Sequence, residues 1–377
     1  MCTMLRFIFL TVMVVACGAA SPVRAQFGAR EAEDLGLRKL AESGDAEAQF
    51  QLGLRLVSGQ GVAKAIPVEG ASWIMKSAKQ DNEKAMHVLA SLYEDGLGVE
   101  KNPAKFIEWE QKAADKGLAD AQFGLAVAYD TGKGVEKDQS VGAEWVAKSA
   151  EQGFPPAEAY YAAKLSRGEG VPKDLRTAAM WFLKSAQHDN SFAQRQLAYL
   201  YYTGGGVPID YKRCEAWYRR AAMREDDPWA SNDLAWFLST CPDKAFQNGK
   251  EAVSIAKRAI RVLQDEKGEQ RHEMVDTMAA ALARNGQFTE AVLWQKKCIT
   301  LLGEDKELGK EDRAKLAKEF DGRLKLYSSQ KAYTDEPAKP EGKAAPLAED
   351  NILEDRDGSS QPARPDQKPK KKKGNVT

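Results

Sequence analysis

The chain has 377 residues, of which 43% are hydrophobic, and its 55 basic residues balance its 55 acidic residues. This balance argues against a nucleic-acid or polyanion binder, because such a protein needs a net basic surface. Its three histidines, His87, His188 and His272, lie far apart in the sequence, so we expect no histidine-rich metal site.

The first 25 residues have the features of a secretory signal peptide. Arg6 precedes an apolar run over residues 7–16, and small residues lead up to Ala25. The run is too short to span a bilayer, and this order of segments is typical of cleaved export signals. We therefore expect residues 1–25 to be removed and the mature chain to be exported, either to the periplasm or as a secreted protein.

A second processing site is the alternative. Residues 14–17, Val-Val-Ala-Cys, resemble the lipobox of bacterial lipoproteins, in which Cys17 becomes the lipidated N-terminus. The signal would then cover residues 1–16, and the mature chain would be a membrane-anchored lipoprotein. Residues 26–44 are expected to form a lead-in to the folded part.

A repeat of 36 residues dominates residues 45–225. Tryptophans recur at this spacing, each is followed five residues later by alanine, and each is preceded by a Gly-x-Gly-Val turn. A further alanine stands eleven residues before each turn. The tryptophans are Trp73, Trp109, Trp145, Trp181 and Trp217. Columns that stay in phase over five units indicate an array of equivalent structural units.

Each unit is predicted to be a hairpin of two helices. Ala121, Leu125 and Tyr129 are spaced four residues apart, which places them on one face of a helix. The paired glycines that follow can adopt the left-handed conformation of a helix C-cap. An Asn or Asp three residues after the valine supplies an N-cap for the second helix in every unit but the first. The tryptophan and the later alanine form the buried stripe of this second helix.

A cation stands three residues after each tryptophan. We interpret these cations as solvated residues that are favourable near a helix C-terminus, rather than as an anion-binding ladder. They are Lys76, Lys112, Lys148, Lys184 and Arg220. No single hairpin can bury apolar faces on both of its sides, so neighbouring hairpins must stack. The fold class predicted is all-α, a right-handed superhelical solenoid of helix-turn-helix repeats.

The repeated pattern, A-x3-L-x3-Y-x2-G-x-G-V followed by W-x4-A, resembles the Sel1-like repeat, a longer-looped relative of the tetratricopeptide repeat. The resemblance covers residues 45–225. It implies a protein-binding scaffold whose concave face is lined by the first helix of each hairpin.

The pattern changes from residue 229 onward. Residues 229–302 have the column spacing of two tetratricopeptide-like units, with the polar Gln295 where that family prefers an aromatic residue. Residues 307–330 are predicted to form a capping helix. Residues 335–377 are rich in proline, lysine and acidic residues, so we expect a disordered tail. Lipidated Cys17 or the lysine-rich terminus would provide the chain's contact with a membrane.

No motif indicates a catalytic, cofactor or metal site. The Gly-x-Gly-Val turns follow helices rather than strands, so they are not nucleotide-binding loops. Cys214, Cys241 and Cys298 are irregularly spaced, and we interpret them as small buried apolar residues. We therefore predict that the protein is not an enzyme and needs no cofactor.

The resemblance also places partner-binding residues on the concave face, along the first helices. They are Phe50, Leu54, His87, Phe123, Val127, Phe192, Tyr199 and Tyr202. The competing interpretation is that these residues pack between hairpins. For His87, the competing interpretation is a polar contact with another residue of the fold. We predict a non-catalytic scaffold of the bacterial cell envelope that binds an unidentified peptide or protein. The alternatives are an enzyme or glycan-binding protein acting on cell-wall polymers, and self-assembly through an uncapped solenoid end.

Overall fold

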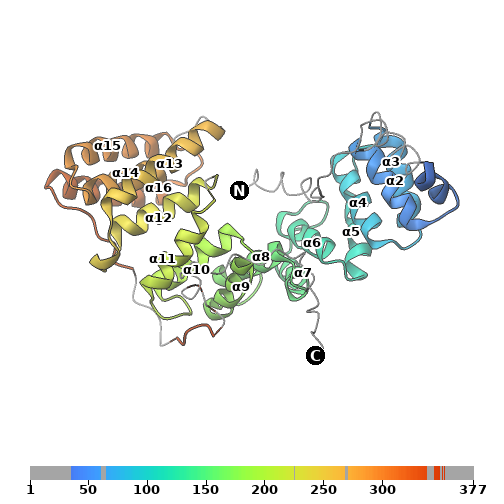
Figure 1. The fold of residues 1–377 in the computed structure, drawn as a ribbon, viewed down its shortest axis with the longest axis horizontal. Coiled ribbons are helices and arrows are strands. Elements are labelled where there is room, and N and C mark those ends of the chain that lie inside the picture. The colour runs from blue at the N-terminus through green and yellow to red at the C-terminus, as the bar shows by residue number, and fades with distance from the viewer. Residues whose placement is uncertain are drawn as a thin grey trace, which may run out of the picture. The chain divides into compact units, whose positions relative to one another are not determined.

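The computed structural model describes residues 35–60, 65–224, 226–267, 271–337, 344–348, 350 and 352. The predicted signal peptide, the lipobox alternative and the start of the lead-in lie outside these residues. All regular structure in the described residues is helical, and the helices follow one another as antiparallel pairs (Figure 1). None of these helices is both long and apolar enough to cross a bilayer. The chain divides into two compact units, residues 1–121 and 122–377.

Five hairpins cover the region of the 36-residue repeat. The first two are α2 (Ala46–Ser58) with α3 (Pro67–Ala78), and α4 (Glu83–Asp95) with α5 (Pro103–Asp115). The next three are α6 (Ala119–Thr131) with α7 (Gln139–Glu151), α8 (Pro155–Arg167) with α9 (Leu175–Gln187), and α10 (Ser191–Thr203) with α11 (Tyr211–Ala221). Consecutive hairpins in each compact unit pack against one another, as α7 does against α8 and α11 against α12.

The helices continue beyond the repeats. They are α12 (Pro228–Thr240), α13 (Gly249–Lys267), α14 (His272–Arg284), α15 (Phe288–Glu304) and α16 (Lys310–Ser328), with a 3-10 turn, η3 (Lys244–Phe246), between the first two. The pairs α12 with α13 and α14 with α15 make two more hairpins, and α16 packs against α15. The second compact unit is therefore a continuous stack of hairpins that ends in a single helix.

The ends of the repeat helices depend on the residues that the sequence repeats. Gly96, Gly168 and Gly204 have left-handed φ angles of 75° or 76°, and they end α4, α8 and α10. The second helices begin where a side-chain oxygen accepts a hydrogen bond from a first-turn N–H, as expected. These N-caps are Asn102, Asp138, Asp174 and Asp210. The first repeat has no such bond at Ile66, which precedes α3.

The second glycine of the turn has a separate function that the sequence interpretation missed. A Cβ atom at Gly98 would lie 2.1 Å from the carbonyl oxygen of Pro67, and one at Gly170 would lie 1.9 Å from that of Gln139. Pro67 and Gln139 begin the second helices of the preceding repeats. These glycines therefore allow the turn of one repeat to lie directly against the backbone of the repeat before it.

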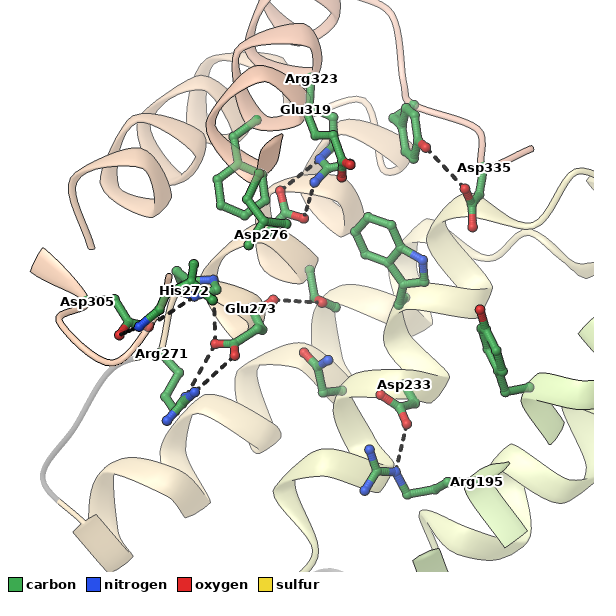
Figure 2. Close-up of a pocket in the computed structure, with 18 of the residues that line it drawn as sticks. Arg195, Asp233, Arg271, His272, Glu273, Asp276, Asp305, Glu319, Arg323 and Asp335 are labelled. Carbon is green, nitrogen blue, oxygen red and sulfur yellow. Dashed lines mark hydrogen bonds and ion pairs between the residues drawn. The ribbon is translucent and has the colours of Figure 1, made fainter. Parts of the chain in front are cut away.

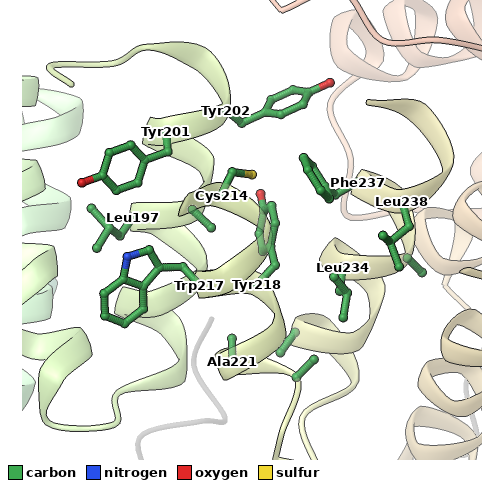
Figure 3. Packing of buried hydrophobic residues seen from close by; sticks show 14 of the residues in the cluster. Leu197, Tyr201, Tyr202, Cys214, Trp217, Tyr218, Ala221, Leu234, Phe237 and Leu238 are labelled. Atoms are coloured by element: carbon green, nitrogen blue, oxygen red, sulfur yellow. The ribbon is translucent and has the colours of Figure 1, made fainter. Parts of the chain in front are cut away.

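Alanines hold the neighbouring helices close together. Ala85, Ala157 and Ala193 of the first helices are fully buried, and so is Ala186 of a second helix. Larger side chains fill the space between these contacts, and Figure 3 shows Leu197, Trp217, Tyr218 and Phe237 packed within one core cluster of the second compact unit.

Each repeat also pairs its tryptophan with its own cation. The Nζ atoms of the lysines lie 3.7–4.2 Å from the ring centroids, and the Cζ atom of the arginine lies 5.6 Å away. The pairs are Lys76 with Trp73, Lys112 with Trp109, Lys148 with Trp145, Lys184 with Trp181, and Arg220 with Trp217. These are cation–π contacts. The regular cations therefore have a partner that helix-end electrostatics alone did not predict.

Some described residues of the C-terminal tail contact the solenoid, in a segment that we expected to be disordered from residue 335. The backbone N–H of Asp335 donates a 2.8 Å hydrogen bond to the carbonyl of Thr240. Further along, Leu347 and Ile352 are only 5% and 6% exposed. These apolar residues of the tail are thus buried against the solenoid, where the contact removes them from water. Disorder of the tail stays a prediction, since most of residues 335–377 lie outside the described residues.

Candidate functional site

The second compact unit contains a hollow of about 800 Å³. Its lining comes from α10, α11, α12, α14 and α16, from the loop before α16 and from the segment after it (Figure 2). We call this hollow the groove. Its residues are Arg195, Gln196, Tyr199, Tyr218, Asn232, Asp233, Trp236, Arg271, His272, Glu273, Asp276, Thr277, Asp305, Glu307, Leu308, Leu316, Glu319, Phe320, Arg323, Tyr333 and Asp335.

Helical periodicity brings these residues to one surface. On α10, Arg195 and Tyr199 are four residues apart, and so are Asn232 and Trp236 on α12. Residues at this spacing share a face of a helix. Because α10, α12 and α14 are the first helices of consecutive hairpins, their equivalent faces line one side of the stack. Of the predicted partner-binding residues, Tyr199 belongs to this lining.

A buried ion pair lies at the base of the groove. The guanidinium of Arg323 donates to Asp276 through Nε and is 3.0 Å from each carboxylate oxygen. Gln295 donates a third hydrogen bond of 2.9 Å to the same carboxylate. Burial raises the pKa of Asp276 despite the opposing effects of Arg323 and Gln295. The polar residue at position 295, which departs from the tetratricopeptide pattern, therefore serves as a partner of Asp276.

Three aromatic rings surround the guanidinium of Arg323. Its Cζ atom lies 5.4 Å from the ring centroid of Trp236, 5.0 Å from that of Phe320 and 5.2 Å from that of Tyr333. Burial alone would lower the pKa of Arg323, but the charge and hydrogen bond of Asp276, together with Tyr327 and Tyr333, raise it overall. Arg323 is therefore a fixed cation that connects α14, α12, α16 and the segment after α16.

Further ion pairs line the walls. Arg195 donates to Asp233 at 2.7 Å, and burial raises the pKa of Asp233 against the effect of Arg195. Nearby, Nε2 of His272 lies 3.4 Å from a carboxylate oxygen of Asp305. These basic and acidic groups lie side by side in Figure 2, so the walls offer both donors and acceptors to a ligand.

One aromatic side chain stands free of this packing. Tyr199 is 54% exposed, although its neighbours Ala198 and Leu200 on the same helix are buried. Trp236 and Tyr333 are half-buried, and their ring centroids are 6.0 Å apart. The groove thus combines an exposed aromatic ring with paired charges, which is a composition that suits binding of another chain.

The predicted partner-binding residues of α10 lie in three different environments. Tyr199 lines the groove. Tyr202 is 6% exposed and donates a 3.0 Å hydrogen bond to Asp335, a lining residue. Phe192 is 42% exposed and contacts the ring of Phe182 instead of facing the groove.

Two more of these residues lie in α6. The ring of Phe123 makes edge contacts with Phe154 and Tyr160 at centroid distances of 5.7 and 5.6 Å. This is the packing between hairpins that we considered as the competing interpretation. Val127 is half-buried on the same helix.

The remaining predicted residues belong to the first compact unit. Phe50 is 6% exposed, and Leu54 is half-buried. Nδ1 of His87 lies 2.8 Å from Oε2 of Glu110, so this histidine has a buried polar partner. The sequence did not identify Trp236, Asp276 or Arg323, because they follow the repeats and belong to no column of the 36-residue pattern.

The described residues contain no group of three or more His, Cys, Asp or Glu side chains that could hold a metal ion. Cys214, Cys241 and Cys298 are all buried and free. Burial raises the pKa of Cys241 to about 11, so its thiol is protonated at neutral pH and is a poor nucleophile.

Comparisons with known proteins agree with the repeat. The Sel1 repeat family model matches residues 46–82, 83–118, 119–154, 155–190 and 191–226. A protective antigen present in uropathogenic Escherichia coli strains, displaying an SLR fold, is 25% identical, with a TM-score of 0.61 over 80% of this chain and 68% of that chain. A Sel1 repeat protein from Oxalobacter formigenes is 24% identical, with a TM-score of 0.55 over 66% of this chain and 98% of that chain. A search of curated protein sequences gives no match.

Proposed function

Because this chain is a Sel1-like repeat protein, we propose that it holds a partner peptide or partner helix in the groove. Sel1 repeat proteins are generally protein-interaction scaffolds. The observation that carries the proposal is the exposure of Tyr199, which is 54% accessible at the edge of a concave surface in a folded chain. A rigid aromatic side chain in such a place is a typical anchor for a partner.

The lining of the groove indicates what such a partner should carry. An apolar side chain of the partner would cover Tyr199. Polar groups of the partner would interact with the Arg195–Asp233 pair, which is partly exposed, with side-chain exposures of 18% and 26%. The Arg323–Asp276 pair, with exposures of 8% and 7%, is too deeply buried to exchange partners and instead keeps the groove rigid.

We also propose that the groove is not catalytic. The raised pKa values of Asp233 and Asp276 are the observation that favours the enzyme alternative, because catalytic acids often have such shifts. However, each carboxylate is held by a guanidinium at 2.7 or 3.0 Å, so neither is a free acid or base. Hydrolysis of cell-wall glycan by the wild type, and not by Asp276→Asn, would replace the scaffold with an enzyme.

Location in the cell envelope is a further part of the proposal. It is supported by the order of charge, apolar run and small residues within residues 1–25. Mass spectrometry of the mature chain tests it directly. An N-terminus at Gln26 would identify a cleaved signal, and a lipidated Cys17 would identify a lipoprotein. A chain that keeps Met1 would contradict both.

A photo-crosslinking amino acid at position 199 tests the groove. We expect it to capture a partner from cells that express the protein. The control places the same amino acid at Leu293 on α15, which is 62% exposed and lies outside the groove. Equal capture from both positions would contradict the assignment.

In a second comparison, Tyr199→Ala should lose the partner. Phe123→Ala, which alters packing between hairpins, should not affect binding unless folding is lost.

A further inference from the structure

The fifth repeat differs from the others in the burial of its tryptophan. Trp217 is 1% exposed, whereas the tryptophans of the other four repeats are only half-buried. Tyr201 of the same hairpin is also 1% exposed. Figure 3 shows Tyr201 and Trp217 extending to one side of the hairpin, and Tyr202 and Tyr218 to the other. The first side is where the C-terminal tail lies.

The carboxylate of Asp350, from the tail, binds on this side of the hairpin. The side chain of Asp350 is 0% exposed. It accepts hydrogen bonds from the hydroxyl of Tyr201 and, at 3.2 Å, from Nε1 of Trp217. Nε of Arg213 lies 3.7 Å away. A buried carboxylate that meets a guanidinium and two neutral donors is a specific contact, because an unpaired charge would not be tolerated there.

The buried indole of Trp217 has its hydrogen-bond acceptor outside the fifth repeat, in Asp350. In the first repeat, the indole of Trp73 donates a 3.3 Å hydrogen bond to Glu69, four residues earlier on its own helix. The equivalent position in the fifth repeat is Arg213, a cation that attracts an acid instead of replacing one. Across the other repeats this position holds Glu69, Lys105, Val141 and Thr177. The combination of Tyr201, Arg213 and Trp217 is therefore particular to the fifth repeat.

The backbone of the tail is held as well. Arg176 of the fourth repeat donates to the carbonyl oxygens of Ala345 and, at 3.1 Å, Pro346. The same guanidinium donates to the carbonyl of Gly206, in the turn of the fifth repeat. Arg176 has no equivalent in the first three repeats, where Val68, Ala104 and Ser140 take its place. Apolar side chains complete the contact, since Leu347 and Ile352 are buried members of the core cluster that includes Trp217.

We propose that this surface, formed by Arg176, Tyr201, Arg213 and Trp217, is a second peptide-binding site. It recognises a short peptide with the pattern Leu-x-x-Asp-x-Ile, and Leu347, Asp350 and Ile352 of the same chain occupy it as an internal ligand. Two apolar side chains and one carboxylate make a small contact, so a peptide of the same pattern can compete with the tail for the site. The site is separate from the groove, and it does not depend on the function proposed there.

The test uses the full chain and a fluorescent peptide of residues 344–352, whose binding is followed by anisotropy. In wild type the internal ligand competes with the peptide. We expect the double variant Leu347→Ser/Asp350→Asn to bind the peptide at least tenfold more tightly than wild type. Glu336→Gln, an exposed residue of the same tail, is the matched control and should bind it as wild type does. Adding Arg213→Gln to the double variant should weaken binding at least tenfold.

Fluorine NMR of 5-fluorotryptophan provides a second readout. The chain has eight tryptophans, and Trp217→Phe identifies the resonance of interest. This resonance should move in the double variant and stay unchanged in Glu336→Gln, while the other resonances report that the fold is intact. Equal peptide affinities for wild type and the double variant would overturn the proposal. So would a wild-type dimer that becomes monomeric in the double variant, because the tail would then occupy a second copy.

Discussion

The ammonium group of Lys164 lies 2.7 and 2.9 Å from the two carboxylate oxygens of Asp130, and it connects the fourth repeat to the third. Both side chains are removed from water, with exposures of 2% and 9%. The hydroxyl of Tyr160 donates a further hydrogen bond of 2.8 Å to Asp130. Removal of one partner leaves a buried charge without compensation, and this costs more than the pair itself contributes.

We therefore expect Lys164→Met to lower the free energy of unfolding by about 3–5 kcal/mol. Urea denaturation followed by circular dichroism measures this change. Lys164→Met/Asp130→Asn removes both charges and keeps an acceptor for Tyr160, so it should recover most of the loss. If the single variant costs less than about 1 kcal/mol, the pair behaves as an exposed salt bridge and does not hold the repeats together.

The pair of His87 and Glu110 predicts a pH dependence of stability. Burial alone would lower the pKa of His87, but the adjacent Glu110, together with Asp120 and Glu94, raises it above its ordinary 6.5. Burial also raises the pKa of Glu110 above its ordinary 4.5, against the effect of His87. A group whose pKa is raised by folding stabilises the folded state below its unfolded pKa. That contribution is lost as pH rises through the folded pKa.

The contribution of Glu110 should thus be complete below pH 4.5 and that of His87 below pH 6.5. Both should decline at higher pH. Urea denaturation at a series of pH values is expected to show the free energy of unfolding of wild type falling with pH more steeply than that of His87→Gln/Glu110→Gln. Parallel profiles for the two proteins would show that the pair does not titrate in this way.

Substitution of Gln295 tests how the buried carboxylate of Asp276 is compensated at the base of the groove. Its side chain is fully buried and donates to Asp276, so Gln295→Leu should remove one of the bonds that compensate this carboxylate. We expect a loss of about 1–3 kcal/mol in the free energy of unfolding. Asp276→Asn in the Gln295→Leu background should add to the loss, because it leaves the buried guanidinium of Arg323 without its carboxylate partner. A Gln295→Leu variant as stable as wild type would mean that Arg323 alone compensates Asp276.

The sequence predicted the features of this fold that recur. Alanine columns, C-cap glycines and N-cap residues act within one hairpin, and their spacing of 36 residues makes them visible without a structure. The caps at Asp138 and Asp174 and the buried Ala193 follow directly from the pattern. Local physical rules govern each of these features, and repetition confirms the phase of the pattern.

The candidate site was harder to predict because its contacts join residues outside the pattern. Arg323 meets Asp276 across 47 residues, and Asp350 meets Tyr201 across 149. Composition alone suggested that the tail would not order, since it cannot form a core by itself. That argument does not consider burial against another element, and Leu347 is buried in the core cluster that includes Trp217 of the fifth repeat.

Alanine substitutions at the two glycines of a turn should have different effects on stability, although both glycines have left-handed φ angles. Gly168 ends α8, and a Cβ atom there would come no closer than 3.3 Å, to the Cβ atom of Lys173. At Gly170 the added atom would lie 1.9 Å from the carbonyl oxygen of Gln139, on the preceding repeat. Gly168→Ala therefore carries mainly the cost of a left-handed residue, about 1–2 kcal/mol.

Gly170→Ala carries that cost and also forces two repeats apart, so we expect a loss of about 3 kcal/mol or more in the free energy of unfolding. Hydrogen exchange should show the added loss at the contact between α7 and α8, where the repeats meet. Gly168→Ala, with the same change of side chain two residues earlier, controls for backbone strain. If the two variants are equally unstable, the second glycine is needed only for its φ angle. The close approach between successive repeats would then not depend on it.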